Sequence, residues 1–168
     1  MTTIVDKTDK EIDQWIKNYE AKKQTDKPFY HELLEERARR TQAKHVLNME
    51  RSLTRLEEAA ADGVCVSYGD LAKASGVEWS RARHQMNGPQ GHLDRLLELC
   101  HARKFPLLTA ICVNQDRIEE GELGEEALAG FVAAARRLGY AVTDEREFHH
   151  QARDACWSWG EARRAVSA

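Results

Sequence analysis

The segment that decides the fold reads Val66-Ser67-Tyr68-Gly69-Asp70-Leu71-Ala72-Lys73-Ala74-Ser75-Gly76 and continues with Trp79-Ser80-Arg81-Ala82-Arg83-His84. Ser67 and Asp70 stand three residues apart, an acidic variant of the capping box that starts a helix. Gly76 supplies the left-handed residue that ends a short helix. A second short helix then begins at Glu78 or Ser80. Two short helices joined by a glycine-containing turn are typical of a helix-turn-helix.

The second of these helices has the composition of a helix that reads nucleic acid. Ala82 and Met86 lie four residues apart and mark its inward side, whereas the other sides are basic or polar. In this motif the second helix presents polar side chains to the major groove, where arginine pairs well with guanine and asparagine with adenine. We therefore predict contacts to phosphates by Ser67, Tyr68 and Arg95, and contacts to bases by Ser80, Arg81, Arg83, His84 and Asn87.

A family resemblance supports this prediction. The phrase from Ser67 to Ala72, with Gly76 and the triplet 81–83, resembles the winged-helix DNA-binding module of alkylguanine-DNA alkyltransferases and alkyltransferase-like proteins. It is also similar to winged-helix segments beside nuclease domains in bacterial defence proteins. The resemblance covers roughly residues 64–113, and the whole chain is similar to a set of uncharacterised bacterial proteins with this module. It implies that Tyr68 helps to rotate a nucleotide out of the duplex and that Arg81 or Arg83 fills the gap.

The resemblance does not extend to alkyl transfer. In that family the reactive cysteine lies in a Pro-Cys-His-Arg turn after the strand. Here Cys100 and His101 lie inside a helical pattern over residues 93–104, before the strand, and no proline precedes them. Adjacent residues on a helix do not face each other, so this thiol and imidazole do not naturally pair. We expect no catalytic residue, and an enzyme acting through Cys100 is the minority hypothesis.

The remaining sequence is predicted to be largely helical. Apolar residues at helical spacing indicate helices over residues 8–23, 28–40, 44–61, 93–104, 125–138 and 144–164, the second and third of which either join or stay separate. A short strand is expected over residues 64–66, and Leu107–Val113, apolar on both faces, predicts a central strand. Residues 87–91 predict a turn, and residues 114–123 a loop or wing. The predicted fold is mainly α with a small β-sheet (α+β), with an N-terminal helical hairpin at 1–43, a winged helix-turn-helix module at 44–123 and C-terminal helices packing on it at 124–168.

Composition and charge narrow the class of protein. The chain has 168 residues, of which 42% are hydrophobic and 32% charged, and its net charge is −3. It contains no apolar run of the roughly 18 residues that a membrane helix needs, and Met1–Asp9 lacks an apolar signal region, so we expect a cytoplasmic protein without membrane contact. Residues 63–104 hold six Lys or Arg against four Asp or Glu, whereas the segments on either side are acidic. DNA affinity should therefore be modest and sensitive to salt.

Cysteine and histidine spacing gives no metal motif. The four cysteines are far apart, and the absence of a Cys-x-x-Cys pair argues against zinc fingers, so we expect free thiols. The adjacent His149 and His150 point toward a metal, but neighbours on a helix rarely chelate one ion and the sequence offers no evident third ligand. We predict neither a metal nor another cofactor.

Two functions remain open on the sequence. The leading hypothesis is a non-catalytic DNA-binding protein that is regulatory or accessory to DNA repair, defence or mobile elements. The alternative is a protein–protein interaction module in which the helix-turn-helix is structural and a partner binds the N-terminal hairpin and the tail around Trp157 and Trp159. Trp79 is equally ambiguous, because it either stacks on a sugar or base or fills the core between the two short helices.

Overall fold

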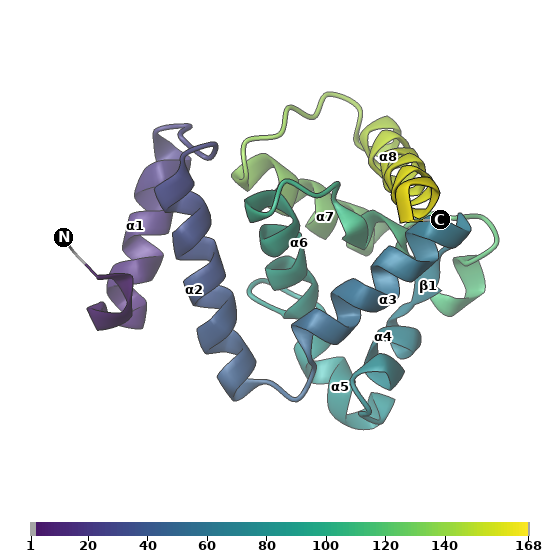
Figure 1. Ribbon diagram of the computed structural model, residues 1–168, viewed down its shortest axis with the longest axis horizontal. Coiled ribbons are helices and arrows are strands. Elements are labelled where there is room, and N and C mark those ends of the chain that lie inside the picture. The colour runs from purple at the N-terminus through teal and green to yellow at the C-terminus, as the bar shows by residue number, and fades with distance from the viewer. Residues whose placement is uncertain (1–2, 168) are drawn as a thin grey trace.

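The structure is a computed structural model that describes residues 3–167, shown in Figure 1. It is mostly helical with one small sheet. Its α-helices are α1 (Asp9–Ala21), α2 (Pro28–Lys44), α3 (Met49–Asp62), α4 (Tyr68–Ala74), α5 (Trp79–Met86), α6 (His92–Ala102), α7 (Glu125–Arg137) and α8 (Glu145–Ser167). The strands are β1 (Val66–Ser67) and β2 (Cys112–Val113), and the 3-10 helices are η1 (Ile4–Asp6), η2 (Leu108–Ile111) and η3 (Gln115–Arg117).

Capping residues set several helix boundaries where the sequence predicts them. Thr8 and Glu11 form a capping box at the start of α1, and Ser67 and Asp70 form another at the start of α4. Each box satisfies two backbone N–H groups that would otherwise lack a partner at a helix start. Gly63, at φ +67°, ends α3 in the left-handed conformation that glycine adopts without a steric penalty.

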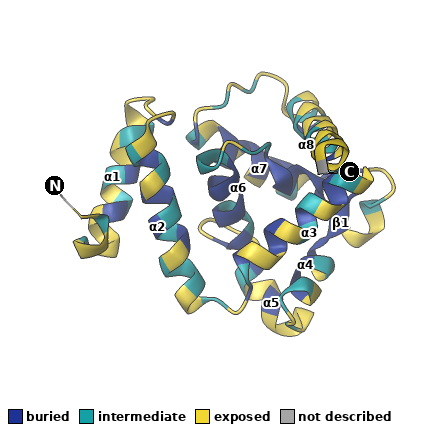
Figure 2. Ribbon diagram, in the orientation of Figure 1, coloured by how far each residue is buried: buried dark blue, intermediate teal, exposed yellow. Residues whose placement is uncertain are grey.

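The helices pack around a core that lies beneath α3, α6 and η2. In Figure 1, α1 and α2 form a hairpin at one side of the molecule, and α2 packs on α6. At the other side α8 lies along α3, which is the most extensive helix–helix contact in the described chain. Figure 2 shows that α6 is buried along nearly its whole length, whereas α5 is mostly exposed. The α5 helix is therefore held at the periphery of a rigid helical body.

A glycine allows α3 and α8 to approach each other closely. A Cβ atom built on Gly160 of α8 would lie 2.3 Å from the carbonyl carbon of Ala60 and 2.4 Å from the backbone nitrogen of Ala61. Both neighbouring atoms belong to backbone, which cannot rotate away as a side chain can. Gly160 is therefore required by helix packing rather than by its own backbone conformation.

The prediction of a long central strand over Leu107–Val113 is wrong in its extent. The segment is buried as expected, but residues 108–111 form the 3-10 helix η2 and only Cys112 and Val113 are strand. The apolar residues on both faces of this segment therefore indicated that it is buried, but they did not determine the length of the strand. The strands β1 and β2 pair in parallel, with Val66 opposite Cys112, and the connection between them includes α6.

Of the two alternatives for residues 114–123, the structure supports a loop rather than a β-hairpin wing. The segment Asn114–Leu123 contains the 3-10 helix η3, and no residue of it that the structure describes belongs to a strand.

The predicted boundary between the second and third helices also differs, because α2 runs to Lys44 and a break at residues 45–48 precedes α3. Gln42 stabilises this break: its side chain donates to the Leu47 carbonyl at 2.8 Å and accepts from the Met49 N–H at 2.7 Å. Within residues 3–167, no helix combines the length and apolar character needed to cross a bilayer.

Candidate nucleic-acid interface

The two short helices α4 and α5 are joined by a turn that glycine makes possible. Gly76 lies at φ +72°, its N–H donates to the Lys73 carbonyl at 2.9 Å, and the Val77 N–H donates to the Ala72 carbonyl at 3.0 Å. This pair of hydrogen bonds is the Schellman arrangement that ends a helix. The turn and α5 are also tied to the start of α3, because the Asn48 N–H donates to the Ser75 hydroxyl at 2.8 Å and the Val46 N–H donates to the Gln85 side chain at 2.9 Å.

The exposed face of α5 carries four of the five residues that the sequence assigns to base contact, and the fifth, Asn87, follows the helix in an extended conformation. Ala82 and Met86 are buried and attach α5 to the core, as predicted. Successive residues on a helix turn by about 100°, so the residues opposite this buried side can be placed by arithmetic. A polar stripe runs along the middle of the exposed face, and one arginine stands on each of its edges. We call this set the α5 surface: the stripe Ser80 and His84, with Arg81 and Arg83 at its edges.

The arginines of the α5 surface differ from most others in the chain because they lack carboxylate partners. Among residues 3–167, eleven of the sixteen arginines have a carboxylate oxygen within 4.0 Å. The five that do not are Arg51, Arg55, Arg81, Arg83 and Arg117. Four of these five lie on α3 and α5, so four arginines of that region have no carboxylate oxygen within 4.0 Å.

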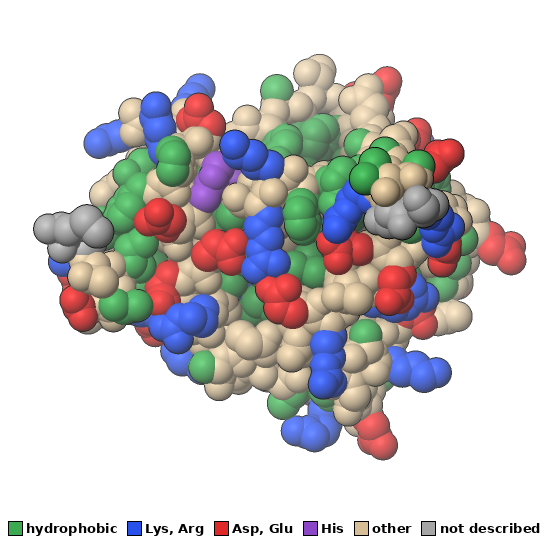
Figure 3. Space-filling model, viewed as in Figure 1, with side chains coloured by type: hydrophobic (Ala, Val, Ile, Leu, Met, Phe, Trp, Pro, Cys, Tyr) green, Lys and Arg blue, Asp and Glu red, His purple; other side chains and the backbone are tan. Residues whose placement is uncertain are grey.

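Figure 3 shows Lys and Arg side chains along the lower edge of the molecule, where Figure 1 places α4 and α5, while the Asp and Glu side chains of this view lie mostly above that edge. Lys73 on α4 is exposed and also lacks a carboxylate partner in the described chain. Sequence reasoning passed over Lys73, Arg51 and Arg55, although α3 carries the last two four residues apart on one side of the helix. Trp79 is 43% exposed at the start of α5, so it does not serve only as core.

Two of the residues predicted to contact phosphate, Ser67 and Tyr68, are buried. Ser67 is 2% exposed, and its hydroxyl is used to cap α4 by accepting from the Asp70 N–H at 3.0 Å. Tyr68 is 9% exposed, and burial raises the pKa of its phenol to about 12. Tyr68 lines a cavity of about 680 Å³ between α6 and α7, and Asn87 lines the same cavity at its α5 end. The structure thus brings these two predicted residues together at a hollow, away from the outermost part of α5.

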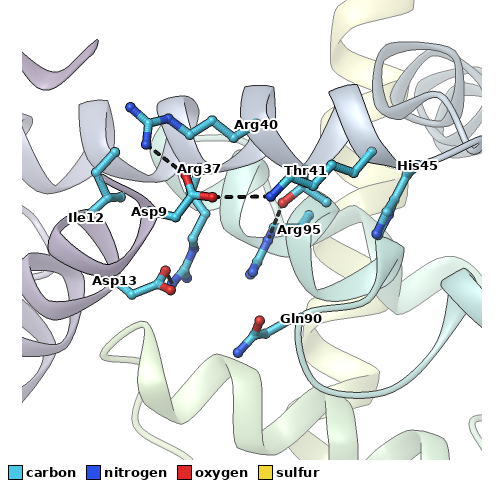
Figure 4. Close-up of a pocket in the computed structure, with 10 residues that line it drawn as sticks. Asp9, Ile12, Asp13, Arg37, Arg40, Thr41, His45, Gln90 and Arg95 are labelled. Atoms are coloured by element: carbon cyan, nitrogen blue, oxygen red, sulfur yellow. Dashed lines mark hydrogen bonds and ion pairs between the residues drawn. The ribbon is translucent and has the colours of Figure 1, made fainter. Parts of the chain in front are cut away.

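Arg95 does not belong to the exposed surface. It is 4% exposed, and Figure 4 shows its side chain directed into a pocket of about 210 Å³ between α2, α6 and the turn at Gln90. Its Nε donates to the Thr41 hydroxyl at 3.1 Å, and its Nη1 donates to buried Glu98 at 3.1 Å. The expected phosphate contact is therefore not available at Arg95, because the residue faces inward on α6 and its guanidinium is already bonded to Thr41 and Glu98. The sequence showed a helical arginine but could not show which side of α6 the α2 hairpin covers.

The cysteine candidate is inert in this geometry. Cys100 is fully buried, and burial raises the pKa of its thiol to about 12, so the thiolate needed for nucleophilic attack is scarce at neutral pH. Its neighbour His101 points elsewhere: the Nε2 donates to the Thr25 carbonyl at 2.6 Å, and the Nδ1 accepts from the Tyr140 hydroxyl at 3.2 Å. All four cysteines are free and buried, in agreement with the prediction of free thiols.

The aromatic tail expected to recruit a protein partner is largely covered. Trp157 donates its indole N–H to the Val64 carbonyl at 3.0 Å and lies beneath the Arg153 guanidinium. Trp159 packs against Phe105 with ring centroids 5.2 Å apart, and the Arg163 guanidinium lies over the Trp159 ring at 4.3 Å. These rings stabilise the attachment of α8 and leave little apolar surface free.

No protein-family model, curated protein or solved structure matches the chain. The chemistry of the α5 surface is consequently the main guide to function.

Proposed function

We propose that this protein binds duplex DNA through a helix-turn-helix formed by α4 and α5, with the α5 surface facing the major groove. The observation that carries the proposal is the pair of exposed arginines, Arg81 and Arg83, that flank a polar stripe and have no carboxylate partner in the described chain. Such a face matches the groove in charge, because phosphates line both edges of the groove and base edges lie along its floor.

Within this proposal the residues of the α5 surface have different roles. Arg81 and Arg83 reach the two phosphate backbones, and Lys73 on α4 adds a further cation. Ser80, His84 and Asn87 meet the base edges, where an asparagine pairs well with adenine. Met86 and Ala82, both fully buried, attach α5 to the core, and the Gln85 side chain accepts from the Val46 N–H in the segment before α3. We retain the helix-turn-helix of the winged-helix resemblance without a hairpin wing, and we place the protein among non-catalytic factors regulatory or accessory to DNA repair, defence or mobile elements.

The experiment is a fluorescence-anisotropy titration of duplex DNA with the full chain, repeated between about 50 and 200 mM salt. Each phosphate contact contributes nearly one to the slope of log K against log salt. The double variant Arg81→Ala plus Arg83→Ala should therefore weaken binding and lower that slope by nearly two. A matched control removes the same charge elsewhere: Arg136→Ala plus Arg164→Ala, two partly exposed arginines on α7 and α8.

Two results would overturn the proposal. One is the absence of binding at about 50 mM salt, where electrostatic contacts are strongest. The other is an equal loss of affinity in the control variant, which would show attraction to net charge alone rather than to the α5 surface. In either case the protein–protein interaction module becomes the better hypothesis, and the exposed Trp79 is the first residue to test in it.

A further inference from the structure

We propose that Glu122, His149 and His150 form a binding site for a divalent transition-metal ion of the zinc class. The two histidines are adjacent on α8, and the structure brings Glu122 to them from the loop before α7. One ring nitrogen of each histidine and one carboxylate oxygen of Glu122 all lie within 4.8 Å of one another. Two imidazoles and one carboxylate form a recognised zinc ligand set, which leaves a fourth position for water or another ligand.

The state of His149 is an independent sign of a ligand. Its side chain is fully buried, and its Nε2–H donates to the Ala110 carbonyl at 2.9 Å. The remaining lone pair is on Nδ1, which is buried and has no hydrogen-bond partner among the described residues. An unpaired buried acceptor is costly. A histidine that donates one ring N–H to a backbone carbonyl and offers the other nitrogen is the usual arrangement of a metal-ligating imidazole.

The other two groups are placed to complete the site. His150 Nε2 lies 2.6 Å from Glu122 Oε1, so an ion entering between them requires the pair to separate by less than an ångström for typical zinc–ligand lengths of about 2.0–2.2 Å. His150 is about one-third exposed, which gives the ion a path from solvent.

Two arginines compete with a metal for Glu122. Arg146 Nη1 lies 3.1 Å from Glu122 Oε2, and Arg153 Nη1 lies 3.8 Å from Oε1. Both have other acceptors: Arg146 also donates to the Leu123 carbonyl at 2.7 Å, and Arg153 donates to the Gly121 carbonyl at 3.0 Å and pairs with Asp154. They need not leave the site when an ion enters, but their charge weakens the binding of a cation. The geometry thus predicts a site of moderate affinity that strengthens when Arg146 is neutralised.

The test is a titration of the full chain with Zn²⁺ in competition with a chromophoric chelator. We expect one ion per chain, a loss of at least tenfold in affinity in Glu122→Gln and in His150→Gln, and a gain of severalfold in Arg146→Gln. His84→Gln, which removes an exposed histidine from α5, is the matched control and should bind like the wild type. The variants avoid fully buried His149, so that a folding defect does not decide the result; circular dichroism checks each fold.

A second readout identifies the ligands. The visible spectrum of bound Co²⁺ should show nitrogen and oxygen coordination, without a thiolate charge-transfer band, because the three residues of the proposed site include no cysteine. The proposal is overturned by the absence of saturable Zn²⁺ binding, by affinity that Glu122→Gln and His150→Gln leave unchanged, or by a thiolate band. None of these results depends on whether the chain binds DNA.

Discussion

A buried histidine should make the stability of this protein fall between neutral and mildly acidic pH. His92 at the start of α6 is fully buried, and its Nε2 lies 2.7 Å from the hydroxyl of Ser52, also fully buried. Burial lowers the pKa of this imidazole to about 4 in the folded chain. The perturbation that isolates the effect is His92→Gln, because glutamine retains an amide that can bond to Ser52 but cannot be protonated in this range.

The sign and size follow from proton linkage. An unfolded histidine has a pKa of about 6.5, so between pH 6.5 and 4 the unfolded chain binds more protons than the folded chain, and acid favours unfolding. Each pKa unit corresponds to about 1.4 kcal/mol, so the full effect is about 3 kcal/mol, of which about 2.5 kcal/mol is lost by pH 4.5. The wild type should therefore lose this amount of unfolding free energy on acidification in excess of any loss in His92→Gln.

The assay is urea unfolding at a series of pH values from 7 to 4.5, followed by circular dichroism. Other groups also titrate here, so the informative quantity is the difference in unfolding free energy between the wild type and His92→Gln. That difference should change by about 2.5 kcal/mol across the series, whereas the exposed-site control His84→Gln should follow the wild type. Parallel curves for the wild type and His92→Gln would refute the reasoning, since they would mean that His92 takes up its proton in the folded chain as readily as in the unfolded one.

Two further predictions concern packing and thiol chemistry. Gly160→Ala should lower the unfolding free energy by about 1–3 kcal/mol in thermal melts, because its methyl group meets the backbone of Ala60. The control is Gly130→Ala on α7, whose methyl group meets nothing within 4 Å and which should be neutral or stabilising in the same melts. Equal destabilisation by both substitutions would contradict the packing argument. Cys100 should react with iodoacetamide far more slowly in the native chain than in urea, because burial raises the pKa of its thiol to about 12. Peptide mapping by mass spectrometry measures the two rates. Rapid labelling of Cys100 in the native chain would revive the hypothesis of a thiol enzyme.

Local sequence patterns predicted the local structure well because the forces involved act over a few residues. The capping pair Ser67–Asp70 and the left-handed Gly76 lie where the sequence placed them. Helical spacing also identified the buried side of α5, since Ala82 and Met86 are the residues it predicted to face inward. Periodicity was less informative for Leu107–Val113, because a fully buried segment is apolar whether it is strand or 3-10 helix.

The sequence by itself therefore determined where most helices begin and end and which residues of α5 face outward. Only the tertiary structure decided that Arg95 is enclosed by α2 and donates to Thr41 there, that β1 and β2 run parallel, and that Glu122 lies against His149 and His150. The physical reason is range: capping and periodicity depend on neighbours within one or two turns, whereas burial and charge pairing depend on which distant segment packs against a given side of a helix.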